Sequence, residues 1–194
     1  MKRTFLYLLL AVFVLPILSS CSEDEEFNAE NQNAGEIVYD SDRKILVAYF
    51  SATGTTQRLA EQIVSVTGAD VFRIEAANPY AANPYDDSDR IQNESYNNLR
   101  PAVATLPDNV EDYDVIFIGS PIWWHNPAMV VCTFLESYNL DGKIIVPFFT
   151  YGATTYLQQS LDKIYEVTPQ STHLRTYLGN GSVENWLRDI HVIK

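Results

Sequence analysis

The chain has 194 residues, of which 25 are acidic and 13 are basic, so its formal net charge is -12 at pH 7. Such a charge disfavours binding to nucleic acid and to anionic lipid surfaces, and it favours basic partners. The length suffices for one well-filled α/β domain after an N-terminal leader.

The N-terminus has the pattern of an export signal. Two basic residues precede an apolar run over residues 5–18, which is too short for an ordinary membrane span. The run ends in Leu-Ser-Ser-Cys, residues 18–21, which resembles the lipobox of bacterial lipoproteins. The resemblance implies a signal peptide over residues 1–20, a lipid anchor at Cys21, and a location in the cell envelope on the periplasmic or cell-surface side of a bacterial membrane.

Residues 21–42 are polar and acidic, which is typical of a flexible tether. The acidic run at residues 23–26 resembles signals that send some bacterial lipoproteins to the cell surface, and it fits a solvated spacer equally well. With Cys21 acylated, only Cys132 would remain, which excludes an intrachain disulfide and a dithiol mechanism. The folded domain is therefore expected over residues 43–194.

An apolar run over residues 45–50 leads directly into a turn rich in glycine and hydroxyl groups, residues 51–56. A short apolar run bounded by turn residues is typical of a strand that is buried on both faces. After the turn, apolar residues recur with a helical period up to residue 64. The pattern predicts a strand, a tight turn and an amphipathic helix that ends at Gly68.

The turn has the composition of an anion-binding site. Backbone N–H groups at a helix N-terminus are unpaired and favour negative charge, and Gly54 has no Cβ to keep an anion away. The turn contains neither a lysine nor a GxGxxG pattern, which excludes a nucleoside-triphosphate P-loop and the dinucleotide fingerprint. Neutral donors alone suit a single phosphate monoester, and the alternative is that Ser and Thr merely cap the helix. The candidate phosphate ligands are Ser51, Thr53, Gly54, Thr55 and Thr56.

The spacing of several residues in this stretch resembles the phosphate-loop signature of the flavodoxin family. They are Ser51, Gly54, Thr56, Ala60 and Ile63. The resemblance extends from about residue 44 to the C-terminus, and it is to those flavodoxin-like proteins that carry a Pro-Ile-Trp-Trp loop, found here at residues 121–124. It implies FMN as the cofactor, with the phosphate at the turn. Ala48 departs from the signature, which prefers a larger residue there.

A long insertion, residues 76–109, follows a predicted strand at residues 70–75. It holds the pentapeptide Ala-Ala-Asn-Pro-Tyr twice, and the Asn-Pro steps favour turns, with a short polar helix expected after them. Loops of this length are more often functional than idle, and the resemblance places this one over part of the flavin site. Tyr80, Tyr85 and Arg90 are therefore candidates for a lid, with ordinary surface positions as the alternative.

A second fully apolar strand is predicted at residues 115–118, and the Gly-Ser-Pro sequence at residues 119–121 is expected to end it. Further along, Asn126 can cap a helix and Pro127 can occupy its first position. This arrangement predicts a helix over residues 128–138.

Two adjacent tryptophans at the carboxyl end of this strand are the second part of the predicted site. Ligands of open α/β sheets bind at that edge, and a flat aromatic cofactor would stack on one of the two rings, whereas core packing is the alternative. Relatives usually have glycine after the second tryptophan, where a peptide can flip when flavin is reduced. The histidine found here is expected to donate a proton, to bind substrate, or to be a plain loop residue. The predicted ring-binding residues of this loop are Pro121, Ile122, Trp123, Trp124 and His125.

A third buried strand at residues 143–149 ends in a loop that supplies the remaining predicted site residues. By resemblance, this loop clamps the other side of the isoalloxazine ring. A helix over residues 155–167, a strand over residues 173–178 and a helix capped by Ser182 complete the chain. The predicted cofactor contacts here are Thr150, Tyr151 and Gly152, with Tyr151 as a second stacking residue.

The order of these elements predicts an α/β fold: a doubly wound five-stranded parallel sheet in a flavodoxin-like three-layer sandwich. The loops after its first, third and fourth strands converge at one edge. With FMN there, the chain is expected to be an electron-transfer flavoprotein with an unidentified redox partner. The alternatives are an FMN-dependent quinone-type reductase and a non-enzymatic surface binding lipoprotein that has lost the flavin. No Ser/His/Asp set, metal cluster or carboxylate pair stands out, which disfavours hydrolases and metalloenzymes.

Overall fold

The structure, a computed structural model, describes most of the chain beyond the leader. It covers residues 35–152, 154–179 and 181–194. The predicted signal peptide, the lipidation site at Cys21 and the acidic run that follows it lie outside the described residues. Across the described part, no helix has the length and apolar character needed to cross a bilayer.

The last residues of the expected tether contact the domain. The backbone N–H of Gly35 donates to the carbonyl of His173 at 2.6 Å. Ile37 is partly buried against the apolar core. The chain therefore joins the folded domain before the expected boundary at residue 43, because an apolar side chain in this segment finds a partner surface.

Five parallel strands form the centre of the molecule in the order β2-β1-β3-β5-β6, so the predicted doubly wound sheet is confirmed. They are β1 (Ile45–Tyr49), β2 (Asp70–Arg73), β3 (Val115–Trp123), β5 (Ile144–Thr150) and β6 (Thr172–His173). A sixth, two-residue strand, β4 (Asn126–Pro127), pairs antiparallel with the end of β3.

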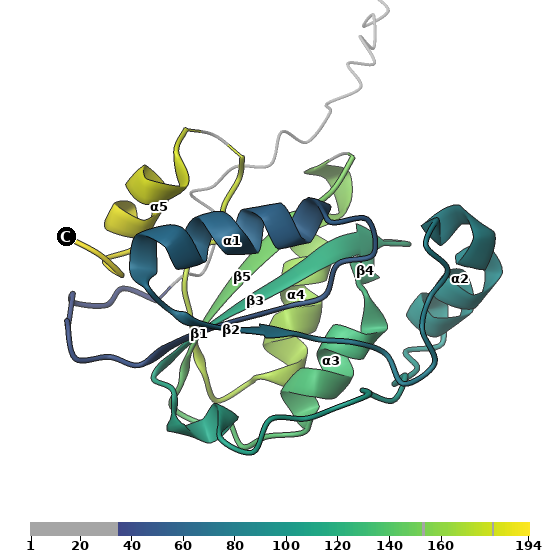
Figure 1. Cartoon of the computed structure of the whole chain (residues 1–194), viewed down its shortest axis with the longest axis horizontal. Coiled ribbons are helices and arrows are strands. Elements are labelled where there is room, and N and C mark those ends of the chain that lie inside the picture. Colours follow the sequence, from purple (N-terminus) through teal and green to yellow (C-terminus); the bar gives the residue numbers. More distant parts are fainter. Residues whose placement is uncertain (1–34, 153, 180) are drawn as a thin grey trace, which may run out of the picture.

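Helices cover both faces of this sheet (Figure 1). They are α1 (Thr55–Thr67), α2 (Ser88–Tyr96), α3 (Met129–Glu136), α4 (Leu157–Val167) and α5 (Val183–Asp189), with short 3-10 turns at Pro84–Asp87, Val110–Asp112 and Thr154–Tyr156. Alternate strand residues serve the two faces: Val47 and Phe117 pack with α1 and α5, whereas Ala48 and Ile116 pack with α3 and α4. The three-layer sandwich is therefore confirmed, and α2 lies outside its layers, beyond the end of β3 (Figure 1).

The predicted ends of two helices are confirmed. Gly68 follows α1 with φ +69°, and its N–H donates to the carbonyl of Val64 at 2.8 Å. Ser182 precedes α5, and its hydroxyl accepts a hydrogen bond from the N–H of Asn185.

Two predictions about the segment after β3 are wrong. β3 continues to Trp123 rather than ending near Ile118, and Asn126–Pro127 form β4 rather than the cap and first turn of a helix. The side chain of Asn126 donates to the hydroxyl of Ser95 at 2.9 Å, so a contact with the insertion takes the place of a helix cap. α3 begins only at Met129, without a side-chain cap.

The last strand is also shorter than predicted. β6 contains two residues. Beyond them, the backbone N–H of Leu174 donates to the carbonyl of Ile145 at 3.0 Å, and an isolated bridge joins Tyr177 to Phe148 of β5. Between these points the indole N–H of Trp186 donates to the carbonyl of Arg175 at 2.9 Å. The backbone at this edge is therefore bound partly to α5 instead of to the sheet.

Gly119 sits where three strands approach closely, and we predict that Gly119→Ala destabilises the domain. A Cβ at this position would lie 2.3 Å from Cζ of Phe148 and 2.9 Å from Cβ of Tyr49. Overpacking of this kind costs about 1–3 kcal/mol. Urea unfolding measures the loss, and Gly152→Ala, which meets no atom within 4 Å, is the matched control. Equal stability of the two variants would contradict the prediction.

Candidate functional site

A cavity of about 720 Å³ opens at the carboxyl edge of the sheet. Its walls come from the turn after β1, the insertion, the end of β3 and the loop after β5. The residues lining it are Thr53, Thr55, Asn83, Pro84, Tyr85, Ser88, Ile91, Pro121, Ile122, Trp123, Trp124, His125, Thr150, Tyr151, Gly152 and Tyr156. The three loops that were expected to converge are thus in one place, as the carboxyl-end rule requires.

The turn after β1 presents unpaired backbone donors. Gly54 has φ +83°, a conformation that favours glycine, and its N–H donates to the hydroxyl of Ser51 at 3.1 Å. The first N–H groups of a helix lack intrahelical acceptors, and the described residues supply none for Thr55 and Thr56. The turn can therefore accept an anion at the N-terminus of α1.

The hydroxyl groups of this turn do not serve as the cap of the helix. The N-cap residue is Gly54, which has no side chain to serve as a cap. Thr53 and Thr55 share a hydrogen bond of 3.3 Å at the cavity wall. The buried Thr56 hydroxyl lies 2.8 Å from the hydroxyl of Thr150, which joins this turn to the loop after β5.

The turn itself contains neutral donors only, and the structure adds a cation from α1 beside it. A terminal guanidinium nitrogen of Arg58 donates to the hydroxyl of Thr55 at 3.3 Å. The other lies 3.9 Å from the point where a Cβ on Gly54 would stand. Thr55 and Arg58 are three residues apart on α1, and this spacing places them on the same face of the helix. That spacing was the available signal in the sequence.

The two tryptophans have different surroundings. Trp123 packs edge-on against Phe50 and Tyr80, with ring centroids 5.3 and 5.2 Å away, so it belongs to a cluster of three rings. Trp124 is 38% exposed, and its nearest ring is Tyr96 at 5.9 Å. Of the two, Trp124 is therefore the ring with a free surface for a planar ligand.

Trp124 and His125 form the tip of the β3–β4 hairpin, and both have positive φ, +45° and +74°. A two-residue hairpin turn with positive φ at both positions is of the type I′ kind, which favours Asn-Gly. Bulky residues in this region cost about 1–2 kcal/mol each. The histidine at position 125 therefore carries backbone strain that a glycine would avoid.

The His125 ring faces another aromatic ring at the cavity wall. It stacks on Tyr156 with a centroid distance of 3.7 Å and an interplanar angle of 22°. Tyr156 was not predicted as a site residue because it stands where a new helix was expected to begin. No pattern in the sequence linked it to the hairpin.

The insertion supplies one wall of the cavity, and its two predicted tyrosines have different places. Tyr85 is 87% exposed at the cavity, where a lid residue would stand. Tyr80 is partly buried and donates to Glu94 at 2.6 Å, with Arg90 over its ring at 4.0 Å. Burial and the Glu94 carboxylate raise the pKa of Tyr80. Tyr80 and Arg90 therefore hold the insertion together and do not form a lid.

The loop after β5 completes the wall opposite the hairpin. Thr150, Tyr151 and Gly152 all line the cavity, as predicted. Burial raises the pKa of Tyr151 above its usual value, so its phenol remains a neutral donor at ordinary pH.

Nucleophilic and metal chemistry find little support in the described residues. They contain no group of three side chains suited to bind a metal ion. Burial raises the pKa of the Cys132 thiol to about 12, and Cys132 does not line the cavity. A buried thiol of this kind is inert as a nucleophile.

The open parallel sheet with a cavity at its carboxyl edge defines a doubly wound α/β protein. The sequence profile of the flavodoxin family matches residues 44–190. The chain therefore belongs to the flavodoxin family.

Solved structures with the same fold include proteins from Bacteroides and Lactobacillus species. A candidate flavoprotein from Bacteroides eggerthii is 35% identical over 78% of this chain and 100% of that chain, with a TM-score of 0.65. A candidate flavoprotein from Bacteroides uniformis is 30% identical over 75% and 98%, with a TM-score of 0.64. A flavoprotein from Lactobacillus acidophilus, solved in complex with FMN, is 24% identical over 69% and 91%, with a TM-score of 0.62, and shows the fold alone. Comparison with curated proteins gives no match.

We predict that the two tryptophans contribute unequally to stability. Trp123→Ala removes one ring from a packed cluster and should cost about 2 kcal/mol or more of unfolding free energy. Trp124→Ala removes an exposed ring and should cost less than about 1 kcal/mol. Urea unfolding of both variants measures the difference. A larger loss in Trp124→Ala would contradict the assigned roles.

Proposed function

We propose that the protein is an FMN-binding electron-transfer flavoprotein, held outside the cytoplasm by a lipid at Cys21. One observation carries the cofactor: a turn with free backbone donors and an exposed aromatic wall line the same cavity. FMN has a phosphate monoester and a flat ring, and these two features need those two surfaces. Family membership and the FMN-bound structure from Lactobacillus acidophilus add support.

The residues of the cavity would divide the task of binding. The turn after β1 would hold the phosphate through Thr53, Thr55 and the N–H groups at the start of α1, with Arg58 offsetting its charge. Trp124 would stack on the ring from one side. Tyr151 and Gly152 would form the opposite wall. When bound, the flavin supplies the electron-carrying group, and the protein supplies position and environment.

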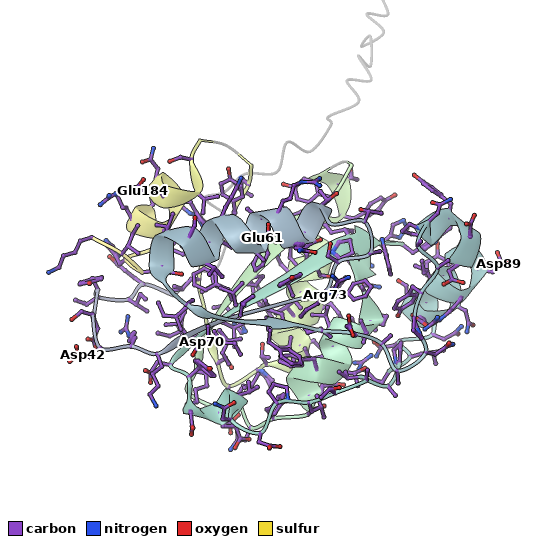
Figure 2. The ribbon with its side chains drawn as sticks, viewed as in Figure 1. Asp42, Glu61, Asp70, Arg73, Asp89 and Glu184 are labelled. Carbon is purple, nitrogen blue, oxygen red and sulfur yellow. The ribbon has the colours of Figure 1, made fainter. Side chains whose placement is uncertain are left out.

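The distribution of the acidic residues bears on the kind of redox partner that the protein would attract. Figure 2 shows labelled carboxylates on separate elements around the molecule, which are Asp42, Glu61, Asp70, Asp89 and Glu184. The negative charge is distributed over the surface in this view, and a distributed charge supports solubility. A basic redox partner would be attracted from many directions by such a field.

A second candidate function is an FMN-dependent reductase of quinones or similar acceptors. The observation that favours it is the place of His125: its imidazole lines the cavity, where it could donate a proton to a bound acceptor. A reductase turns over a small acceptor in a steady state, whereas a carrier exchanges electrons only with its partner. Steady-state oxidation of a reduced donor with and without menadione separates the two.

We predict that the turn recognises the phosphate of FMN. Thr55→Ala, which removes a hydroxyl at the cavity wall, should weaken FMN binding by about tenfold to a hundredfold, since hydrogen bonds to charged groups are worth about 1.5–3 kcal/mol. Riboflavin, which lacks the phosphate, should bind the variant and the parent equally. Flavin fluorescence quenching on the chain from residue 22 onward measures both affinities.

Two further variants control this experiment. Thr55→Ser keeps the hydroxyl and should bind FMN as the parent does. Arg58→Gln should weaken FMN binding, whereas Arg188→Gln on α5, where the arginine pairs with Glu184, should not. Equal affinities of the parent for FMN and riboflavin would contradict the phosphate site. No binding of either flavin would instead favour a surface binding protein that has lost the cofactor.

We predict that Cys21 carries the membrane anchor. In cells that process lipoproteins, the full chain should partition into detergent and incorporate an azide-labelled fatty acid. Cys21→Ser should do neither. Cys132→Ala should behave as the parent, because Cys132 is buried in the core. Fatty-acid labelling that survives Cys21→Ser would overturn the anchor. If the anchor proposal fails, the FMN proposal is untouched, because the two proposals rest on different segments of the chain.

A further inference from the structure

Two serine hydroxyls hold the tip of the β3–β4 hairpin. Ser95, in the last turn of α2, donates to the carbonyl of Trp124 at 2.6 Å. Ser160 of α4 donates to the carbonyl of His125 at 3.2 Å. Ser95 is 5% exposed and Ser160 is fully buried. The carbonyls of two consecutive residues are thus bound by side chains from two separate helices.

A third contact fixes one of these hydroxyls. The side-chain amide of Asn126 donates to Ser95 Oγ at 2.9 Å, and Asn126 is itself buried. The Ser95 hydroxyl therefore accepts a hydrogen bond from Asn126 and donates one to the carbonyl of Trp124. This bond has two consequences: it fixes the direction of the Ser95 hydroxyl, and it binds α2 of the insertion to the hairpin.

The held residues are the two that carry backbone strain. Trp124 and His125 have positive φ, and neither is the Asn or Gly that a type I′ turn favours. A strained conformation persists only where its surroundings over-determine it. Here the two hydroxyls and the stack of His125 on Tyr156 supply that support.

We propose that Ser95 and Ser160 are positioning residues that fix the Trp124–His125 turn, so that the aromatic wall of the cavity is formed before a ligand arrives. Neither residue lines the cavity, so each acts through the turn. Since α2 also supplies Ser88 and Ile91 to the cavity lining, the bond from Ser95 joins this part of the lining to the hairpin tip. Its effect on ligand binding rests on the proposed function, whereas its effect on the turn does not.

Loss of either serine hydroxyl should weaken binding of the flavin ring and leave binding of the phosphate unchanged. No hydrogen bond among the described residues joins Ser95 or Ser160 to the turn that would hold the phosphate. Loosening the hairpin should therefore weaken FMN and riboflavin by the same factor. Preorganised walls contribute affinity because less order is lost on binding.

Amide hydrogen exchange tests the turn without any flavin. In the chain from residue 22 onward, Ser95→Ala and Ser160→Ala should speed exchange of the backbone amides of residues 124–126 and 128 by about tenfold. Ser171→Ala is the matched control. The Ser171 hydroxyl also donates to a backbone carbonyl, that of Leu140 at 2.8 Å, but this carbonyl precedes β5 and lies at the edge of the sheet away from the cavity. Exchange at residues 124–126 and 128 that is equal in the parent, Ser95→Ala and Ser160→Ala would overturn the proposal.

Flavin titration tests the consequence. Both variants should lose about fivefold to tenfold in affinity for FMN and for riboflavin alike, and Ser95→Thr, which keeps the hydroxyl, should recover the parent values. A loss confined to FMN would overturn the proposal, since it would mean that the phosphate site had changed.

A double-mutant cycle tests whether backbone strain at His125 is the reason that the turn needs the Ser160 hydroxyl. Gly accepts positive φ without a penalty, so in a His125→Gly background the Ser160→Ala change should speed exchange less than in the parent. An equal effect in both backgrounds would overturn the strain argument. If the parent binds no flavin, the proposed function fails, and hydrogen exchange alone decides between a held and a free turn.

Discussion

The whole carboxyl edge depends on the close approach of three parallel strands at Gly119. In the sheet register, Tyr49 of β1 and Phe148 of β5 both lie opposite this glycine. The Phe148 ring fills the volume that a side chain on Gly119 would need. Because the strands stay in register up to this point, the turn after β1, the hairpin after β3 and the loop after β5 all leave the sheet at one edge. The cavity is a consequence of that alignment.

The hairpin shows how the fold tolerates an unfavourable turn. Two bulky residues occupy positions that ordinarily favour Asn and Gly, and the helices around them provide hydrogen bonds to both carbonyls. A strain of a few kcal/mol is large against the stability of a domain, which is about 5–15 kcal/mol. Retaining it is most readily explained by the aromatic rings that the turn carries to the cavity, since local strain concentrates at functional sites.

The sequence predicted the doubly wound sheet and most of the cavity, because these follow from apolar periodicity and from turn residues at strand ends. It did not predict the hairpin: Asn126 and Pro127 match a helix start by local preference, whereas they pair with Trp123 and Ile122 of β3, and the Asn126 side chain is bound by Ser95, thirty-one residues earlier in the chain. Tyr156 was missed for a related reason. Its role depends on stacking with His125, and no local pattern records a contact between two distant loops. Arg58, by contrast, was accessible through its helical spacing from Thr55.

The two halves of the site have separate structural origins. The turn after β1 takes its geometry from Gly54 and the start of α1, whereas the aromatic wall takes its geometry from the hairpin, α2 and α4. Among the described residues, the hydrogen bond between Thr56 and Thr150 is the direct polar link from the turn to the opposite loop. With so few connections, changes in one half should leave the other intact. A ligand with both an anion and a flat ring would then gain affinity from each half additively, because independent sites contribute independent free energies.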